Sequence, residues 1–373
     1  MRDSSSSFQA RVSALQHLWA TRNALAISLL PLAWTFRMIA GLRREQYLRR
    51  RNTLPRPPVP VVVVGNITVG GTGKTPLVIW LAELLKANGY RPGIISLGYG
   101  GRADHWPRIV TALSDPHQVG DEPVLIASRS HCPTAVAPDR FEAARALLEE
   151  YDCDVLIADD GLQHYGLVRD MEIAVIDGDK GLGNRWCLPA GPLREPPSRL
   201  RDVDLVIVHD RRGYTHLGDM RPGVARKNPG VRASARYRMT LEAGQLVNLA
   251  DANLRQPLEA LRGCQVHALA AIGNPARFFD TLKAGGLVLQ THVFRDHHPF
   301  TARDLDFGDA QALVMTEKDA VKCRAFAQAH YWYLPVAALP DAHFARAVLT
   351  RLRVLAAASP KQRSEPLETN RYG

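Results

Sequence analysis

The chain has 373 residues, of which 46% are hydrophobic and 23% charged, and it carries a formal net charge of +10. This composition is typical of a globular protein with a large core and excludes a disordered chain; the length suits two ordinary domains. The five cysteines are scattered and odd in number, which argues against a disulfide framework or a zinc site and fits a reducing compartment.

The positive charge is concentrated near the N-terminus, where residues 1–56 contain ten arginines and two acidic residues. Such an arm can indicate nucleic-acid binding, but here it flanks the uncharged stretch "NALAISLLPLAWTF". As a helix this stretch reaches about 21 Å, short of the roughly 30 Å core of a bilayer, and Pro31 interrupts it. We therefore expect residues 1–57 to form a basic amphipathic helix on an anionic membrane surface. The alternative is a helix packed on the protein itself.

After a proline-rich break at residues 52–60, strand patterns alternate with helical patterns. The expected strands are Val59–Val64, Gly93–Leu97, Thr134–Ala137, Asp154–Ala158, Glu172–Ile176 and Asp204–His209. The expected helices are Thr75–Asn88, Glu122–Ser130 and Asp139–Glu150, the last with Asp139 as its N-cap. Because the strands are continuously apolar, residues 58–236 are predicted to form an α/β core, a parallel sheet with helices on both faces.

A second series of elements predicts a smaller α/β domain at residues 237–358. Its strand patterns are "CQVHALAAI", "LVLQTHVF", "ALVMT" and "HYWYLPV", and helices are expected from Pro275, from Thr301 and up to about Ala357. The polar tail at residues 359–373 is expected to be disordered.

The segment "TVGGTGKT" lies at the turn between the first core strand and the first core helix. Its spacing is that of a phosphate-binding loop, except that Thr68 stands where the usual pattern has glycine. The candidate nucleotide-binding residues are Thr68, Val69, Gly70, Gly71, Thr72, Gly73, Lys74 and Thr75. Lys74 can reach the β- and γ-phosphates, and the Thr75 hydroxyl can ligate Mg²⁺. A purely structural turn, the alternative, does not need Lys74.

The strand of "DVLIADDGLQH" ends in two acidic residues. Ligands of α/β sheets bind at the carboxyl ends of strands, so Asp159 and Asp160 are candidate Mg²⁺ ligands. Gln163 and His164, just beyond them, are candidates for orienting substrate, water or nucleotide.

Two further segments leave alternatives open. Asp121 in "VGDEP" could be a base or a metal partner, or it could simply complement the start of a helix. Arg194 and Glu195 in "LPAGPLREP" lie in a loop rich in turn residues, which could be a functional loop or a rigid connection.

Two segments of the smaller domain also have more than one interpretation. Asp296, His297 and His298 in "FRDHHPF" could form a carboxylate-supported base, a metal site or a solvated turn. In "TEKDAVKC", Thr316 followed by Asp319 favours a helix cap over a functional role.

Taken together, these segments resemble the tetraacyldisaccharide 4′-kinase family of the lipid A pathway. The resemblance extends in order through "VVVVGNITVGGTGKTP", "GYGGR", "VGDEP", "DDGLQH", "LPAGPLREP", "AIGNPARFF", "DHHPFT" and "MTEKDAVKC". Threonine or serine at position 68 is what this family carries. The resemblance implies transfer of the ATP γ-phosphoryl group to the 4′-hydroxyl of a lipid A disaccharide 1-phosphate. It also implies a location at the cytoplasmic face of the inner membrane, with neither nucleic acid nor an obligate protein partner.

The same resemblance implies roles for individual residues. Asp121 and His297 would activate the sugar hydroxyl, with Lys74 on the ATP side. Asp159 and Asp160 would bind Mg²⁺. Arg194 and Glu195 would line the region that holds the sugar or its phosphate.

The chain departs from the family pattern at Leu97, where an arginine is usual; Arg102 or Arg91 would have to replace its contacts. One alternative is a MinD/ArsA-like membrane-associated ATPase switch, but that group carries lysine where this chain has Val69. A second alternative, a nucleic-acid-binding scaffold, leaves Asp121 and the paired aspartates without a role.

Overall fold

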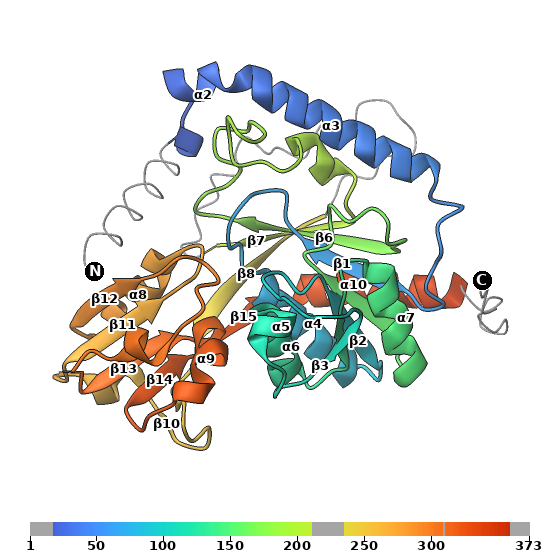
Figure 1. Ribbon diagram of the computed structural model, residues 1–373. Coiled ribbons are helices and arrows are strands. Elements are labelled where there is room, and N and C mark those ends of the chain that lie inside the picture. Colours follow the sequence, from blue (N-terminus) through green and yellow to red (C-terminus); the bar gives the residue numbers. More distant parts are fainter. Residues whose placement is uncertain (1–17, 211–234, 309, 359–373) are drawn as a thin grey trace.

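The computed structural model describes residues 18–210, 235–308 and 310–358. The expected disordered tail, and the first 17 residues of the expected N-terminal segment, lie outside these ranges. The described chain forms a larger and a smaller sheet with helices packed on them, and two helices near the N-terminus lie along one side of the larger unit (Figure 1).

The larger sheet has nine strands in the order β15-β8-β7-β6-β1-β5-β2-β4-β3. At its centre β1 (Val61–Gly65) runs parallel to both β5 (Val155–Asp159) and β6 (Met171–Asp177). The other strands are β2 (Pro92–Ser96), β3 (Arg108–Val110), β4 (Thr134–Val136), β7 (Leu205–His209), β8 (Ala235–Ala243) and β15 (Val336–Pro340). Only the outer pairings β3–β4 and β15–β8 are antiparallel. The predicted parallel α/β core is thus confirmed.

The apolar run of β1 is continuous because both faces of the sheet are covered. Val62 and Val64 lie in one core cluster, together with residues of α4 (Lys74–Ala87), α6 (Asp121–Ser130) and α10 (Ala342–Ala358). Val61 and Val63 lie in the opposite cluster, which includes residues of α7 (Arg140–Glu150). The remaining short helix of this unit is α5 (Pro116–Val119). The Asp139 side chain accepts a hydrogen bond from the Phe141 amide, which confirms the predicted N-cap.

The smaller sheet has six strands in the order β10-β9-β14-β13-β11-β12. These are β9 (Leu246–Asn248), β10 (Arg255–Gln256), β11 (Val266–Ala270), β12 (Leu289–Val293), β13 (Ala312–Thr316) and β14 (Tyr331–Leu334). Its helices are α8 (Pro275–Ala284) and α9 (Glu317–Cys323). The expected boundary between residues 236 and 237 falls inside β8, and the chain returns to the larger sheet through β15 and α10. Two strands therefore connect the units.

The expected helix from Thr301 is a single 3-10 turn, η4 (Ala302–Leu305). Thr301 and Asp304 form a capping box at its start, but Asp306 already has an extended conformation, so the turn does not continue. In the part of the chain that the structure describes, the other 3-10 turns are η1 (Pro197–Arg201), η3 (Leu258–Leu261) and η5 (Arg324–Phe326).

The N-terminal segment forms two helices, α2 (Ala24–Ser28) and α3 (Leu30–Arg49). Pro31 lies in the first turn of α3, where a missing amide hydrogen costs little, so it begins the longer helix and does not disrupt it. Arg44 of α3 forms an ion pair of 2.9 Å with Asp202, and Arg51, just after the helix, donates a hydrogen bond to the Arg169 carbonyl. Among the helices that the structure describes, none is long and apolar enough to span a bilayer.

Candidate active site

The phosphate loop connects β1 to α4. Gly70 and Gly73 have φ angles of 106° and 90°, a region that glycine adopts without strain. Because Gly73 is the N-cap of α4, the first amides of this helix have no side-chain cap and can bind an anion. Thr68 forms an isolated bridge with Leu193, and the Val69 amide donates to the Pro192 carbonyl at 2.8 Å. The loop is therefore held by backbone pairing at the position where the usual pattern has its first glycine.

Charged groups surround this loop at the end of β5. The Lys74 ammonium lies 3.5 Å from the Asp160 carboxylate, and Arg194 lies 3.2 Å from the same carboxylate. Asp159 is buried, and its Oδ1 atom has no hydrogen-bond partner among the described residues. Burial, followed by the charges of Glu122 and Asp160, raises the pKa of Asp159 to about 7 against the opposing charges of Lys74 and Arg140.

An unpartnered buried carboxylate oxygen fits a divalent cation, which would supply the missing charge. Within the described ranges there is no cluster of three or more acidic, histidine or cysteine side chains suited to a metal ion. Mg²⁺ does not require one, because it is commonly bound by one or two carboxylates, phosphate oxygens and water. The Asp159 carboxylate and the Thr75 hydroxyl therefore fit Mg²⁺ next to bound phosphates.

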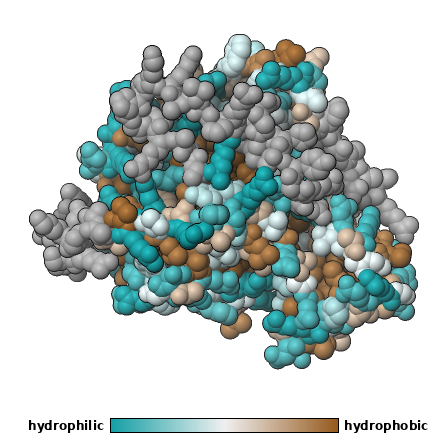
Figure 2. All heavy atoms as spheres, turned by 180° about the vertical axis from the view of Figure 1, so that it is seen from behind, coloured by the Kyte–Doolittle hydropathy of each residue, from teal (hydrophilic) through white to brown (hydrophobic). Residues whose placement is uncertain are grey.

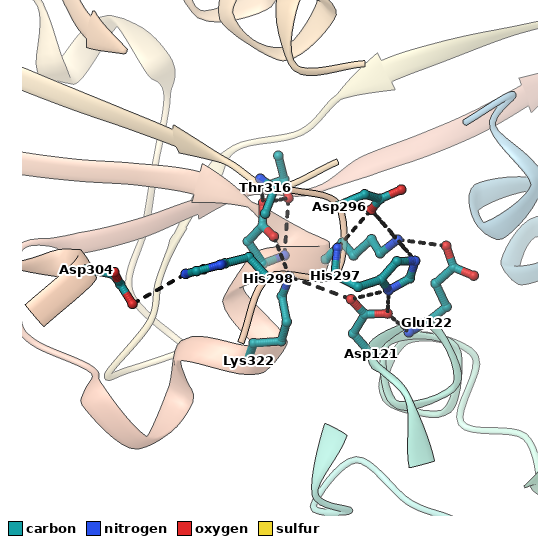
Figure 3. A network of polar contacts seen from close by, with 11 residues as sticks. Asp121, Glu122, Asp296, His297, His298, Asp304, Thr316 and Lys322 are labelled. Carbon is teal, nitrogen blue, oxygen red and sulfur yellow. Dashed lines mark hydrogen bonds and ion pairs between the residues drawn. The ribbon is translucent and has the colours of Figure 1, made fainter. Parts of the chain in front are cut away.

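Asp121 and His297 come from different units of the fold and meet across the junction (Figure 3). Asp121 begins α6, whereas His297 lies in the loop after β12 with a left-handed φ of 59°. The His297 Nδ1 atom is 3.0 Å from Asp121 Oδ1 and 3.1 Å from Oδ2. The Tyr99 ring packs edge-on against the imidazole at a centroid distance of 5.0 Å. A carboxylate on one ring nitrogen is the arrangement that supports histidine as a base.

The environment shifts the pKa values of this pair in opposite directions. Burial raises the pKa of Asp121, but the hydrogen bond to His297 and the charges of Lys318, His297 and Lys322 outweigh burial and lower the pKa to about 2. Burial lowers the pKa of His297, but the hydrogen bond to Asp121 together with the charges of Asp121 and Asp296 outweighs burial, and the net result is a pKa above its ordinary value of 6.5. Asp121 is therefore ionised at neutral pH.

Two lysines beside this pair were missed by the sequence reasoning. The predicted cap is confirmed: the Thr316 hydroxyl accepts from the Asp319 amide at the start of α9. On the same helix, however, Lys318 Nζ lies 3.3 Å from His297 Nε2, and Lys322 Nζ lies 3.6 Å from Asp121 Oδ2. Their spacing of four residues, which places both on one helix face, was a signal that could have been used.

Gln163, His164 and Glu195 were also predicted as site residues, and Gln163 and Glu195 contact each other. Gln163 Nε2 donates to the Asn66 carbonyl at 3.0 Å and to the Glu195 carboxylate at 2.8 Å. Burial, followed by the charge of Arg140, lowers the pKa of His164 to about 4, so this imidazole is neutral at pH 7.

One cavity of about 1200 Å³ joins these groups. Its lining includes the phosphate loop from Val69 to Thr75, the two aspartates at the end of β5, His297 and Lys318. Arg194 and Glu195 also line it, as do Phe36, Ile39, Ala40 and Arg43 of α3. The cavity therefore runs from the nucleotide loop to the histidine and to the N-terminal helix.

The position of Leu97 limits which arginine can replace the one usual in the family. Leu97 lines the cavity just after β2, whereas Arg91 precedes this strand and pairs with Asp152 at 2.8 Å. Arg91 therefore lies at the wrong end of β2 to serve the site. Arg43 and Arg140 do line the cavity.

A phosphate loop, two carboxylates at the end of the neighbouring strand, and a carboxylate-supported histidine in one cavity define a P-loop phosphotransferase. The comparisons narrow this class. The LpxK family model, described as tetraacyldisaccharide-1-P 4′-kinase, matches residues 25–353. The chain therefore belongs to this kinase family.

Individual proteins similar to this chain belong to the same family. A tetraacyldisaccharide 4′-kinase of Nitrosococcus oceani is 46% identical over 341 residues, which is 91% of this chain and 95% of that protein. One of Aromatoleum aromaticum is 50% identical over 335 residues, or 90% and 96% of the two chains. The crystal structure of LpxK from Aquifex aeolicus in complex with ATP matches with a TM-score of 0.70 at 27% identity, covering 88% of this chain and 99% of that one. The alternative of a MinD/ArsA-like switch finds no support in these relatives.

Proposed function

We propose that this chain transfers the ATP γ-phosphoryl group to the 4′-hydroxyl of a tetraacyldisaccharide 1-phosphate, at a membrane surface, with Asp121 and His297 activating the hydroxyl. The observation that carries the proposal is the 3.0 Å contact between these two residues beside the cavity that also contains the phosphate loop. The family relationship supports the choice of acceptor, and the geometry supports the roles proposed for the residues.

The chemistry follows from the positions of the groups. His297 accepts the proton of the 4′-hydroxyl. At the same time the hydroxyl oxygen forms a bond to the γ-phosphorus, and the bond between this phosphorus and the ADP oxygen breaks. Asp121 stabilises the imidazolium that forms. Lys74 and the α4 amides hold the phosphates in line. Bound Mg²⁺, held by Asp159 and Thr75, would neutralise charge on the phosphate oxygens.

The direct test incubates the protein with ATP, Mg²⁺ and a tetraacyldisaccharide 1-phosphate and reads the lipid product by mass and by ³¹P NMR. A product heavier by one phosphoryl group, with a new phosphomonoester at the 4′-position, supports the proposal. ADP release without a phosphorylated lipid would contradict it.

The pH dependence of turnover tests the role of His297. Only the neutral imidazole can take a proton, so kcat/KM should fall as the pH drops through the pKa of His297, which lies above 6.5. Asp121→Asn removes the contact that raises this pKa, so the acid limb should move to lower pH. The check is a pH–rate profile of both proteins. An acid limb that stays in place in the variant would contradict the assignment.

The membrane part of the proposal rests on the exposed face of α2 and α3. Large apolar side chains are exposed there, namely Leu25, Ile27, Leu32, Trp34, Met38, Ile39, Leu42 and Leu48. Hydrophobic residues are also seen at the upper edge of the molecule in Figure 2, the side along which these helices lie. Arginines accompany them, such as Arg37 and Arg43. Exposed apolar side chains interspersed with arginines on a surface helix fit contact with an anionic bilayer interface.

This surface can be tested without removing the helix. Trp34 and Met38 are 64% and 59% exposed, so replacing both with serine should leave the fold intact. Because each large apolar side chain contributes about 1.5–3 kcal/mol on burial, binding to phosphatidylglycerol vesicles should weaken at least about tenfold. KM for the lipid acceptor should rise while KM for ATP stays constant. Val288→Ser, at an 83% exposed site in the smaller unit, is the matched control. Equal sedimentation of both variants would show that the contact lies elsewhere.

A further inference from the structure

Lys318 lies at the ring nitrogen of His297 that faces away from Asp121. Its ammonium is 3.3 Å from His297 Nε2, 3.2 Å from Asp296 Oδ1 and 2.9 Å from Glu122 Oε1. The Lys318 side chain is mostly buried. The Nδ1 atom therefore contacts a carboxylate. The Nε2 atom contacts the Lys318 ammonium, and the Asp296 carboxylate lies farther from it, at 3.7 Å, beyond hydrogen-bond distance.

These two neighbours determine where the proton of the neutral imidazole resides. An ammonium has three donors and no acceptor, so Nε2 must offer its lone pair to Lys318. An ionised carboxylate only accepts, so Nδ1 must carry the hydrogen that is donated to Asp121. The Nδ1–H tautomer makes both hydrogen bonds. The other neutral tautomer, with the hydrogen on Nε2, can make neither of them.

We propose that Lys318 is a positioning residue of the phosphoryl transfer: in the resting protein it holds the neutral His297 imidazole with its lone pair on Nε2, and the acceptor hydroxyl displaces the ammonium from this nitrogen before Nε2 takes the hydroxyl proton. The proposal rests on the function proposed above, because it assigns the orientation of the same base. Asp121 on the opposite nitrogen is the complementary half of this arrangement.

The surroundings keep Lys318 charged and in place. Burial lowers the pKa of Lys318, but Glu122, Asp121 and Asp296 outweigh burial and raise it, so the ammonium persists at neutral pH. The start of α9 is fixed because Asp319 Oδ2 accepts from the Ala271 amide at 2.9 Å and from the Thr316 hydroxyl at 2.7 Å. The cation is thus anchored between α6, α9 and the loop that carries His297.

The charged groups around His297 act on it in opposite directions. Asp121 and Asp296 favour the imidazolium, and the ammonium of Lys318 disfavours it. Lys322 acts through Asp121, 3.6 Å away, and the Tyr99 ring contributes an aromatic edge contact. Removal of Lys318 should therefore raise the pKa of His297, which is the reverse of the effect expected for Asp121→Asn.

The test reads the tautomer directly in the resting protein. Long-range ¹H–¹⁵N NMR of histidine-labelled protein distinguishes Nδ1–H from Nε2–H, and His297→Asn identifies the resonance among the 13 histidines. We expect neutral His297 to carry its hydrogen on Nδ1. In Lys318→Met the Nε2–H form should increase and the pKa should rise, whereas Lys318→Arg, which keeps a cationic donor, should retain more of the wild-type behaviour. The acid limb of kcat/KM should move to higher pH in Lys318→Met.

Two results would overturn the proposal. One is a wild-type His297 with its hydrogen on Nε2, a measurement that needs no variant to fold. The other is a folded Lys318→Met protein with the wild-type tautomer and pKa; Lys283→Met, an exposed lysine on α8, provides the comparison. The proposed function fails by a different observation, unchanged turnover in His297→Ala, so the two failures can be told apart.

Discussion

Turnover of a Lys74→Ala variant is expected to fall by about 10²–10³-fold, because electrostatic groups aimed at a transferring phosphoryl group contribute on that scale. Lys74 is the first residue of α4, and its side chain is only 13% exposed, so its ammonium is largely shielded from water. Its removal takes away the charge that faces the phosphates. It also removes one of the two cations that pair with Asp160 among the described residues, which makes the loop less favourable for an anion.

The measurement is kcat/KM with the lipid acceptor, together with the affinity for an ATP analogue. Lys283→Ala, the exposed lysine on α8, controls for the loss of one positive charge from the protein. Similar melting temperatures of the three proteins would establish that the fold is intact. Near-normal turnover in Lys74→Ala would refute the assignment of the loop as the nucleotide site.

Local sequence patterns were sufficient to predict the core of the fold. Val61 to Val64 alternate between two buried clusters, which is why the strand is uninterrupted by polar residues and why a two-sided sheet could be predicted. The loop after it was also predictable, since strand, glycines, Lys74 and helix follow one another within twenty residues. Asp159 and Asp160 were identified for the same reason: their position at a strand end determines the edge of the sheet on which they lie.

Contacts between distant segments were not predictable in this way. Asp121 and His297 are 176 residues apart, and each has an ordinary local explanation, as a helix start or a turn. The cap at Thr316 explains the start of α9 so well that Lys318 was overlooked. The return of β15 to the larger sheet depends on antiparallel pairing with β8, which no local pattern of hydrophobicity specifies.

The second large effect is expected at the paired histidine. His297→Ala should lower kcat by about 10²–10⁴-fold, the usual contribution of a general base, while leaving the affinity for ATP unchanged. ATP affinity should be spared because the closest described polar contacts of His297 are with Asp121, Asp296 and Lys318 and not with the phosphate loop. Collapse of ATP binding in this variant would instead identify His297 as a nucleotide contact.

Asp121→Asn separates a catalytic pair from two independent groups. The amide cannot act as an ionised acceptor for Nδ1–H, so the imidazole loses the partner that fixes its tautomer and stabilises its cation. In a serine-protease triad, the corresponding change costs about 10⁴-fold in kcat. If Asp121 acts only through His297, the double variant should be no slower than the slower of the two single variants. If the two reductions in kcat multiply, Asp121 must contact the reacting groups by itself. The assignment of Asp121 as a residue that acts only through His297 would then have to be abandoned.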